Sequence, residues 1–165
     1  GLQKEGLDYR GFIFLGFMIE NDEPYMIEYN CRMGDPETEV VMPRLKNDLV
    51  ELFQAVAEQK LDTIKIETDE RTVCTVVAVS GGYPGDYKKG YEIHGLQDIN
   101  PADSVVYHMG TIIKDGKVVT NGGRVFCVTS YGRSIYDAVA ISKEEIEKIT
   151  FTGMEYRSDI GYEFD

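Results

Sequence analysis

A short polar series, Glu28, Asn30 and Arg32, carries the side chains best suited to chemistry in this sequence. It follows the apolar run 25–27 and occupies every second position. Because side chains alternate between the two faces of a strand, these three would lie on one face, about 7 Å apart. Carboxylate and amide oxygens are hard ligands for Mg²⁺, and a guanidinium can bind phosphate or carboxylate through paired hydrogen bonds. The spacing predicts a metal–phosphate edge, with a solvated strand face as the alternative.

Two further acidic residues follow in the same stretch. Asp35 precedes Pro36, and Glu37 follows it. An Asp at the N-cap, a proline at the first helical position and acidic side chains in the first turn all favour a helix start, which is a purely structural explanation. The functional interpretation is contact with an amine-bearing substrate, or support for Arg32. For Arg32 itself, the alternative to an anion-binding role is a salt bridge to Asp35 or Glu37.

Two glycine-containing segments lie further along the chain. In the segment Asn121, Gly122, Gly123 and Arg124, exposed backbone N–H groups precede an arginine, which suits a bound anion. The alternative is a hairpin turn followed by a surface arginine. The segment 81–85 is expected to be a turn, because its glycines permit positive φ and its proline stiffens the loop. It lacks the Lys–Ser/Thr end that a Walker A phosphate loop requires.

The polar series at 28–32 needs a sheet to hold it. The apolar run 11–19 and the segment 25–32 predict a hairpin around a turn at 21–24. Strand alternation would place Met26 on the face of Glu28, and would turn the opposite face toward a core, namely Ile27, Tyr29 and Cys31. A lone hairpin is marginal in water, so we expect this chain to begin inside a larger domain.

Two helices are expected after the hairpin. The first would start with Asp35 as its N-cap and would end or kink at Pro43. The second would start at Asn47 or Asp48, with its apolar face formed by Leu49, Leu52, Phe53 and Val56. The charged stretch 61–71 is interpreted as a boundary, which divides the chain into parts 1–60 and 61–165.

Beyond this boundary the pattern is mostly that of strands. They are predicted at 73–79, 105–108, 111–114, 117–120 and 124–129. A turn at 115–116 would join the third and fourth of them into a hairpin. One helix, or two consecutive pieces, is expected over 135–149. Ser142 with Glu145 would start the second piece as a capping box.

Composition excludes several classes of protein. The net charge of −12 over 165 residues argues against nucleic acid as a partner, because phosphate backbones are bound through a surplus of Lys and Arg. No uncharged apolar run is long enough to span a membrane. Cys31, Cys74 and Cys127 lie far apart with no zinc-site spacing, so we expect three reduced thiols, small core residues in a cytoplasmic protein.

Five blocks of the sequence carry a resemblance to known proteins. They span 28–39, 81–90, 108–111, 121–125 and 156–161, and read EYNCRMGDPETE, GGYPGDYKKG, HMGT, NGGRV and YRSDIG. The first resembles the metal-binding edge of ATP-grasp ligases. Together the blocks resemble the phosphoribosylamine–glycine ligase family over nearly the whole chain. Met109 departs from the family, which more often has a small residue there, and this affects only local packing.

The resemblance implies an α+β fold. A C-terminal piece of an ATP-grasp domain would be followed by a small, mainly antiparallel β domain with one or two helices. It also implies that Glu28 and Asn30 bind Mg²⁺ or Mn²⁺ bridging the ATP phosphates, and that Arg32 stabilises the transferring group. The family joins 5-phosphoribosylamine to glycine through a glycyl phosphate, forming glycinamide ribonucleotide, ADP and phosphate in purine biosynthesis.

Several parts of such an enzyme are not found in this sequence. The family keeps its phosphate-covering glycine loop, its nucleotide-binding lysine and its open α/β substrate domain in the preceding half. We therefore expect no ligase activity from this chain alone, and expect the missing N-terminal half as a partner. Two alternatives remain. One is another ATP-grasp carboxylate–amine ligase, and the other is a non-catalytic module that associates through Phe12, Phe14 and Phe17.

Overall fold

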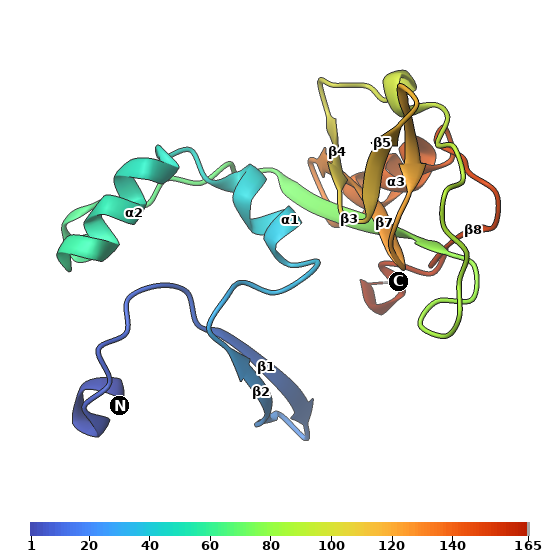
Figure 1. The fold of residues 1–165 in the computed structure, drawn as a ribbon. Helices are drawn as coiled ribbons and strands as arrows, with labels where there is room; N and C mark the ends of the chain where they lie inside the picture. Colours follow the sequence, from blue (N-terminus) through green and yellow to red (C-terminus); the bar gives the residue numbers. More distant parts are fainter. Residues whose placement is uncertain (165) are drawn as a thin grey trace. The chain divides into compact units, whose positions relative to one another are not determined.

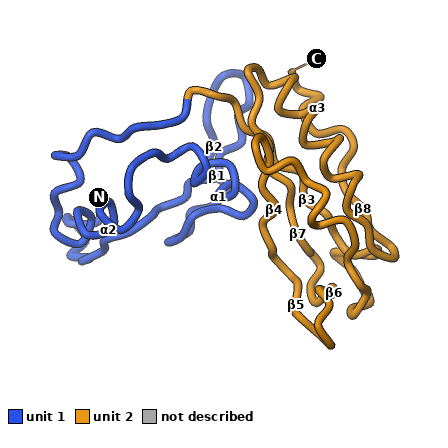
Figure 2. Tube along the Cα trace, turned by 90° about the horizontal axis from the view of Figure 1, so that it is seen from above, with its two compact units in different colours: residues 1–69 blue, residues 70–165 orange. Residues whose placement is uncertain are grey.

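The structure, a computed structural model, describes residues 1–164. The chain divides into two compact units, 1–69 and 70–165, which Figures 1 and 2 display and which we describe one at a time. Helices are few, and every sheet is antiparallel. The expected α+β class is confirmed.

The first unit contains the expected hairpin. Strand β1 (Phe14–Glu20) pairs antiparallel with β2 (Glu23–Asn30), after a short 3₁₀ helix η1 (Leu2–Glu5). Asn21 and Asp22 form the turn with φ of 51° and 63°, a region that Asn and Asp adopt more readily than most residues.

A bulge in β2 corrects the expected alternation of side chains. Gly16 pairs with Glu28 and Phe17 pairs with Met26, so Ile27 is an extra residue with no partner of its own. Such an insertion breaks the regular two-residue period of a strand. Met26 and Glu28 are therefore not related by the simple alternation that the sequence predicted.

The apolar side of the hairpin is exposed, which is a second correction. Ile27 is 65% exposed and Tyr29 is 74% exposed, and Cys31 is exposed as well. The buried residues of the range 1–69 are only Gly34, Leu52 and Ala55. A two-stranded hairpin has no second layer within this unit to bury its apolar residues, so the expected core contact is absent here.

The second expected helix starts as predicted, but its apolar face is only partly buried. Helix α2 (Leu49–Glu58) has Asp48 as its N-cap, and the Asp48 carboxylate accepts hydrogen bonds from the backbone N–H groups of Val50 at 2.8 Å and Glu51 at 3.2 Å. Leu52 is buried, whereas Phe53 remains 47% exposed and packs its ring edge against Phe12, with centroids 6.0 Å apart. Helix α1 (Thr38–Val41) precedes it and leads into η2 (Met42–Arg44), which contains Pro43.

The stretch after α2 and η3 (Leu61–Thr63) belongs to the first unit. It runs back along the segment after α1. The N–H of Lys46 donates to the carbonyl of Glu67 at 2.9 Å, and the N–H of Asp69 donates to the carbonyl of Arg44 at 2.7 Å. Asn47 adds two side-chain hydrogen bonds to this pairing. The division of the family domains at 1–60 and 61–165 stays a prediction.

The second unit is built on a four-stranded antiparallel sheet. Its strand order is β4 (Ser104–His108), β7 (Arg124–Gly132), β3 (Thr72–Ser80) and β8 (Met154–Tyr156). Strands β5 (Thr111–Lys114) and β6 (Lys117–Thr120) form a separate hairpin that turns at Asp115 and Gly116. The five strands predicted in this region are confirmed. Strand β8 was not predicted, because three residues give no readable period.

One helix closes the core of this unit. Helix α3 (Ile135–Ile146) packs on β3 and β7 (Figure 1). The register of these strands sets Val76 opposite Val128 and Ala78 opposite Phe126. All four are buried in one cluster with Ala138 and Ile146 of α3.

The capping box expected at Ser142 is wrong. Helix α3 is continuous, and its capping box is formed by Ser134 and Asp137. Ser142 lies inside the helix, fully buried, and its hydroxyl donates to the carbonyl of Cys74 at 2.9 Å. Glu145 accepts a hydrogen bond from the N–H of Asn100 at 3.0 Å, so its carboxylate holds a loop instead of starting a helix.

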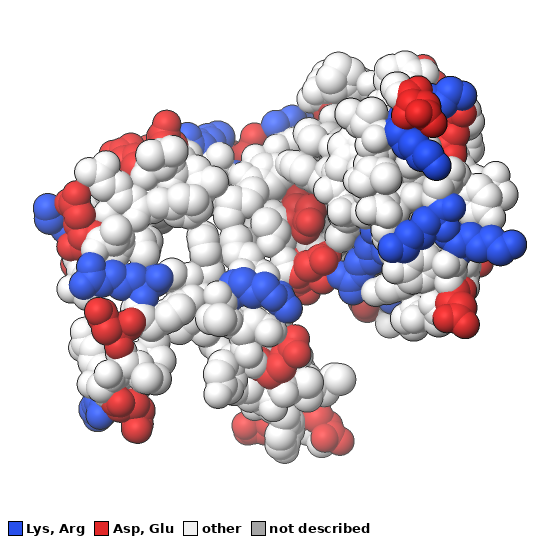
Figure 3. Space-filling model, in the orientation of Figure 1, with Lys and Arg blue, Asp and Glu red and all other residues white. Residues whose placement is uncertain are grey.

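The surface carries charges of both signs. Figure 3 shows acidic and basic side chains interspersed with uncharged ones on the face turned to the viewer. Within residues 1–164, no helix has the length and apolar character needed to cross a membrane. The same residues contain no disulfide; Cys74 and Cys127 are buried as expected, whereas Cys31 is exposed.

Candidate metal–phosphate site

Glu28 and Asn30 lie next to each other at the end of β2. The Asn30 carboxamide nitrogen is 3.3 Å from Oε1 of Glu28, so the two side chains share one face as predicted from their spacing. Gly16, opposite Glu28 on β1, makes room for it: a Cβ on Gly16 would lie 3.2 Å from Cγ of Glu28. The sequence analysis did not single out Gly16, although a glycine within an apolar strand signals a close approach of this kind.

This pair fits a divalent cation that takes its remaining ligands from elsewhere. A half-turn of the Asn30 carboxamide would bring its oxygen beside the Glu28 carboxylate, giving two hard oxygen ligands. The described residues include no group of three or more His, Cys, Asp or Glu able to hold a metal by themselves. Mg²⁺ commonly uses one or two protein oxygens with phosphate and water in the other positions, so two protein ligands suffice.

Arg32 lines the same cavity as Glu28. A cavity of about 300 Å³ in the first unit brings together both residues with Asp35 and Glu37, over the rings of Phe14 and Phe17. Nη1 of Arg32 donates to the carbonyl of Met33 at 2.9 Å. Across residues 1–164 the guanidinium makes no ion pair, so the predicted alternative of a salt bridge to Asp35 or Glu37 is not formed. Four of the predicted site residues therefore line one cavity.

The helix start expected at Asp35 is wrong. Helix α1 begins at Thr38, and its N-cap position is Glu37, which makes no capping hydrogen bond through its side chain. Thr38 instead donates to the carbonyl of Gly34 from both its N–H at 3.1 Å and its hydroxyl at 2.5 Å. Because the first turn is closed on Gly34, the capping explanation for Asp35 no longer holds.

Gly34 leaves room for the Glu37 side chain. A Cβ on Gly34 would lie 2.3 Å from Oε2 of Glu37 and 2.9 Å from Cε2 of Phe14. The carboxylate thus passes directly over the Gly34 backbone, beside the ring that lines the cavity.

The segment from Asn121 to Arg124 lies in the second unit, between β6 and β7. Its glycines have a packing explanation. A Cβ on Gly123 would lie 2.1 Å from the Tyr83 ring, and a Cβ on Gly110 would lie 2.7 Å from Cα of Gly122. The N–H of Ser80 donates to the carbonyl of Gly123 at 2.8 Å, and the Ser80 hydroxyl donates to the carbonyl of Gly122 at 2.8 Å. The segment connects β6 to β7, which lie in different sheets, and Arg124 is half-buried, so the predicted hairpin turn with a surface arginine is wrong. The contact of Gly123 with the Tyr83 ring joins the two glycine-containing segments that the sequence analysis considered separately.

The chain is similar to known proteins over nearly its whole length. Residues 73–163 match the family model described as "Phosphoribosylglycinamide synthetase, C domain", and residues 1–38 match "Phosphoribosylglycinamide synthetase, ATP-grasp (A) domain". The phosphoribosylamine–glycine ligase of Caldanaerobacter subterraneus subsp. tengcongensis is 47% identical over 159 residues, which is 96% of this chain. The chain belongs to the phosphoribosylamine–glycine ligase family.

One further relative and two solved structures are also similar to this chain. The trifunctional purine biosynthetic protein adenosine-3 of Gallus gallus is 45% identical over 98% of this chain, which covers 16% of that protein. The crystal structure of the Thermotoga maritima phosphoribosylamine–glycine ligase matches 96% of this chain with a TM-score of 0.75 and 37% identity. The biotin carboxylase subunit of pyruvate carboxylase, with a TM-score of 0.63 and 15% identity, shares the fold.

This chain spans only part of its relatives. It covers 38% of the Caldanaerobacter enzyme and 39% of the Thermotoga chain. The activity and substrates of a whole ligase are therefore taken up as a proposal.

Proposed function

We propose that the whole protein is an ATP-dependent ligase that joins 5-phosphoribosylamine to glycine, and that this chain supplies the C-terminal part of its site. Membership of the phosphoribosylamine–glycine ligase family supports the reaction. The observation that carries the proposal to particular residues is the cavity shared by Glu28, Arg32, Asp35 and Glu37. The cavity holds three carboxylates and one guanidinium, which makes no ion pair within residues 1–164. Among them, the Glu28 carboxylate and the Arg32 guanidinium are suited to a cation and a phosphoryl group respectively.

In this proposal Glu28 and Asn30 hold a divalent cation, Mg²⁺ or Mn²⁺, through their oxygens. When bound, such a cation offsets the phosphate charge of ATP and orients the group to be transferred. Arg32 donates hydrogen bonds to the phosphoryl oxygens, where negative charge must be stabilised in the transition state. Its lack of an ion pair supports this role, because no carboxylate has to be displaced first.

Asp35 and Glu37 are proposed to contact the amine-bearing substrate. Both line the cavity, and the failure of the capping explanation for Asp35 supports a role outside helix formation.

An anion contact at 121–124 is a separate part of the proposal. It would come from the side chains of Asn121 and Arg124, since packing accounts for the two glycines.

The remaining part of the ATP-grasp domain is needed in this proposal. Its partial match to residues 1–38 and the exposed apolar face of the hairpin both support a missing layer of structure. That layer would carry the nucleotide-covering loop and the nucleotide-binding lysine, so the present chain alone is expected to be inactive.

A cytoplasmic location is part of the same proposal, and the buried reduced thiols Cys74 and Cys127 support it.

The test joins this chain to the preceding part of the Caldanaerobacter ligase, so that the whole length of the family enzyme is restored. ADP formation is measured with ATP, glycine and phosphoribosylamine. It is measured again with other amines replacing phosphoribosylamine. We expect turnover that requires all three substrates, and none from the 165-residue chain alone. Equal use of other acceptor amines would contradict the substrate assignment, and turnover by the chain alone would contradict the missing half.

A pair of variants tests the metal ligands within that full-length protein. Glu28→Gln is expected to lower kcat/KM by about 10²-fold or more, because one charged ligand for the cation is lost, and to raise the Mg²⁺ concentration needed for half-maximal rate. Glu23→Gln, on the same strand at the turn end of the hairpin, makes the same charge change away from the cavity and should leave both quantities unchanged. Equal effects of the two substitutions would contradict the assignment of Glu28.

A further inference from the structure

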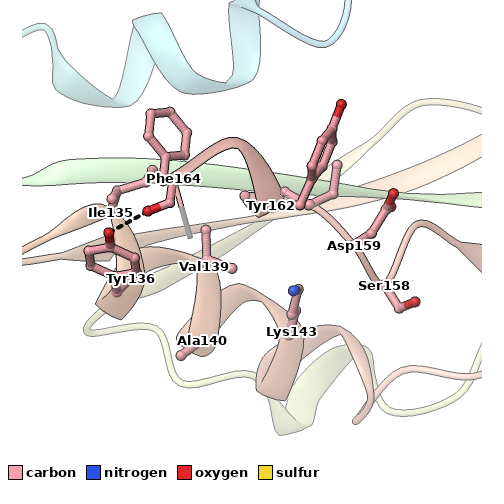
Figure 4. Close-up of a pocket in the computed structure, with 11 residues that line it drawn as sticks. Ile135, Tyr136, Val139, Ala140, Lys143, Ser158, Asp159, Tyr162 and Phe164 are labelled. Carbon is pink, nitrogen blue, oxygen red and sulfur yellow. Dashed lines mark hydrogen bonds between the residues drawn. The ribbon is translucent and has the colours of Figure 1, made fainter.

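A second cavity lies wholly within the second unit, between α3 and the C-terminal segment 158–164. Its volume is about 460 Å³, and its lining includes Ile135, Tyr136, Val139, Lys143, Tyr162 and Phe164 (Figure 4). Cavities of a few hundred Å³ with mostly apolar walls and a few polar groups are typical of small-molecule sites. None of these residues has a part in the ligase site proposed above.

The shape of the cavity is fixed at two points. The hydroxyl of Tyr136 donates to the carbonyl of Phe164 and ties the end of the chain to α3. Gly161, with φ of 91°, brings the segment close to the helix, because a Cβ there would lie 2.9 Å from Cγ2 of Val139. The space is therefore bounded by two anchored elements.

Lys143 gives the cavity a positive charge. Figure 4 shows its amine directed from α3 toward the C-terminal segment. In the range 1–164 the structure records no ion pair for this amine. The one carboxylate in the lining, Asp159, is held by Arg157 through two hydrogen bonds of 2.9 and 2.8 Å. These hydrogen bonds with Arg157 are the main cause that lowers the pKa of Asp159, and the positive charge of Lys143 lowers it further. Arg157 occupies both carboxylate oxygens of Asp159 with hydrogen bonds, so the Lys143 amine keeps its own donors for an anionic ligand.

Aromatic side chains contribute to the lining of the same space. Tyr136, Tyr162 and Phe164 are 59%, 56% and 53% exposed, although all three line the cavity. Figure 4 shows the rings of Tyr162 and Phe164 standing away from α3, on the side to which Lys143 points. Exposed ring faces beside a cavity favour a planar aromatic partner, which gains both apolar burial and ring contacts.

We propose that this cavity binds a small planar aromatic molecule that carries an anionic group. The ring lies among Tyr136, Tyr162 and Phe164, and the anionic group accepts hydrogen bonds from the amine of Lys143. An aryl carboxylate and an aryl phosphate share this chemistry. The site is independent of the ligase proposal, because it uses a different unit of the chain and different residues.

Binding to the 165-residue chain tests the proposal directly. Naphthalene-2-carboxylate is titrated while backbone amide shifts are followed by NMR, alongside naphthalene-2-carboxamide, which has the ring without the charge, and acetate, which has the charge without the ring. We expect saturable binding of the carboxylate, about tenfold tighter than the carboxamide, since a hydrogen bond to a charged group is typically worth that factor. Acetate should bind at least about tenfold more weakly than the carboxylate, because it lacks the ring that is buried among the aromatic side chains. 2-Naphthyl phosphate then shows which anionic group is preferred.

The variants separate this cavity from other surfaces. Lys143→Gln should weaken binding of the carboxylate about tenfold and leave binding of the carboxamide unchanged, whereas Lys143→Arg should retain it. Lys114→Gln, on β5, makes the same charge change elsewhere and should have no effect. Shifts centred on Val139 and Gly161 support the site. Absence of saturable binding, equal binding of the carboxamide, or shifts confined to residues 14–30 would overturn it.

Discussion

Two cysteines of this chain occupy opposite environments. Cys31 is exposed directly after β2, whereas Cys74 lies under α3 with 6% of its surface exposed. Burial raises the pKa of the Cys74 thiol, because a thiolate would lose its hydration there, and the Ser142 hydroxyl only partly opposes this. A raised pKa favours the protonated thiol in the folded state. The corresponding stability is present below the ordinary thiol pKa and is lost as pH rises through the raised one.

This difference predicts selective alkylation. At pH 7.5 the folded chain should take up one N-ethylmaleimide, at Cys31, because the other two thiols are buried. Mass spectrometry after digestion identifies the labelled residue, and Cys31→Ser should remain unlabelled. After unfolding in guanidinium chloride all three cysteines should react. Labelling of Cys74 in the folded chain at a rate similar to Cys31 would contradict the burial described here.

For single residues, the sequence predicts those side-chain positions that depend only on near neighbours in the same strand. The spacing of Glu28 and Asn30 was sufficient to place them on one face, because the strand is regular between them. The bulge at Ile27 was not predictable, since it arises from pairing with β1. The exposure of Cys31 was mispredicted for a similar reason: apolar neighbours indicate burial only where another layer of structure covers them.

Helix α3 depends on its capping box for a defined start. We expect Ser134→Ala to lower the free energy of unfolding by about 1 kcal/mol, because the N–H of Asp137 would lose its acceptor. Urea denaturation followed by circular dichroism measures this. Ser158→Ala, in the exposed C-terminal segment, is the matched control and should change stability by a few tenths of a kcal/mol at most.

If Ser134→Ala lowers the free energy of unfolding no more than Ser158→Ala does, the cap contributes little to the stability of the helix. At the level of elements, Ser134 with Asp137 is the capping box that the structure forms, whereas the sequence analysis singled out Ser142 with Glu145. Only the first starts a helix, because Ser142 shares a buried helical face with Ala138 and Ile146. Spacing alone could not separate them, since the choice depends on which side chains the sheet covers.

The first unit leaves much apolar surface exposed for its size. Exposed side chains on the hairpin alone include Phe17, Met18, Ile19, Met26 and Ile27. Exposed apolar surface on this scale favours association between molecules. We therefore expect the isolated chain to sediment as a mixture whose average mass rises with concentration over the micromolar range.

Replacing Ile19 and Ile27 together by lysine should reduce this association, because both are more than 60% exposed on the hairpin. Ile113→Lys is the control, since Ile113 is 78% exposed on a different hairpin in the second unit. A chain that stays monomeric at every concentration would contradict the prediction. So would a control that reduces association as strongly as the double variant.

For the whole molecule, the sequence predicted a polar boundary followed by a β-rich part, because turn residues and strand periods are local signals. It could not predict how little the first part buries. An apolar content of 42% is ordinary for a globular protein, yet the buried residues of range 1–69 are three. Burial depends on which segments meet, and within these 69 residues no second layer covers the hairpin.

The hairpin of β5 and β6 has a tightly packed base and open space around Gly116 at its tip. At its base, Gly110 and Gly122 are so close that a methyl group on either would meet backbone of the other. At its tip, a Cβ on Gly116 would have no atom within 4 Å. Evolution can therefore lengthen this hairpin outward while its base keeps its glycines. For the same reason the tip is a natural place to insert a tag or a fluorescent label without disturbing the sheet.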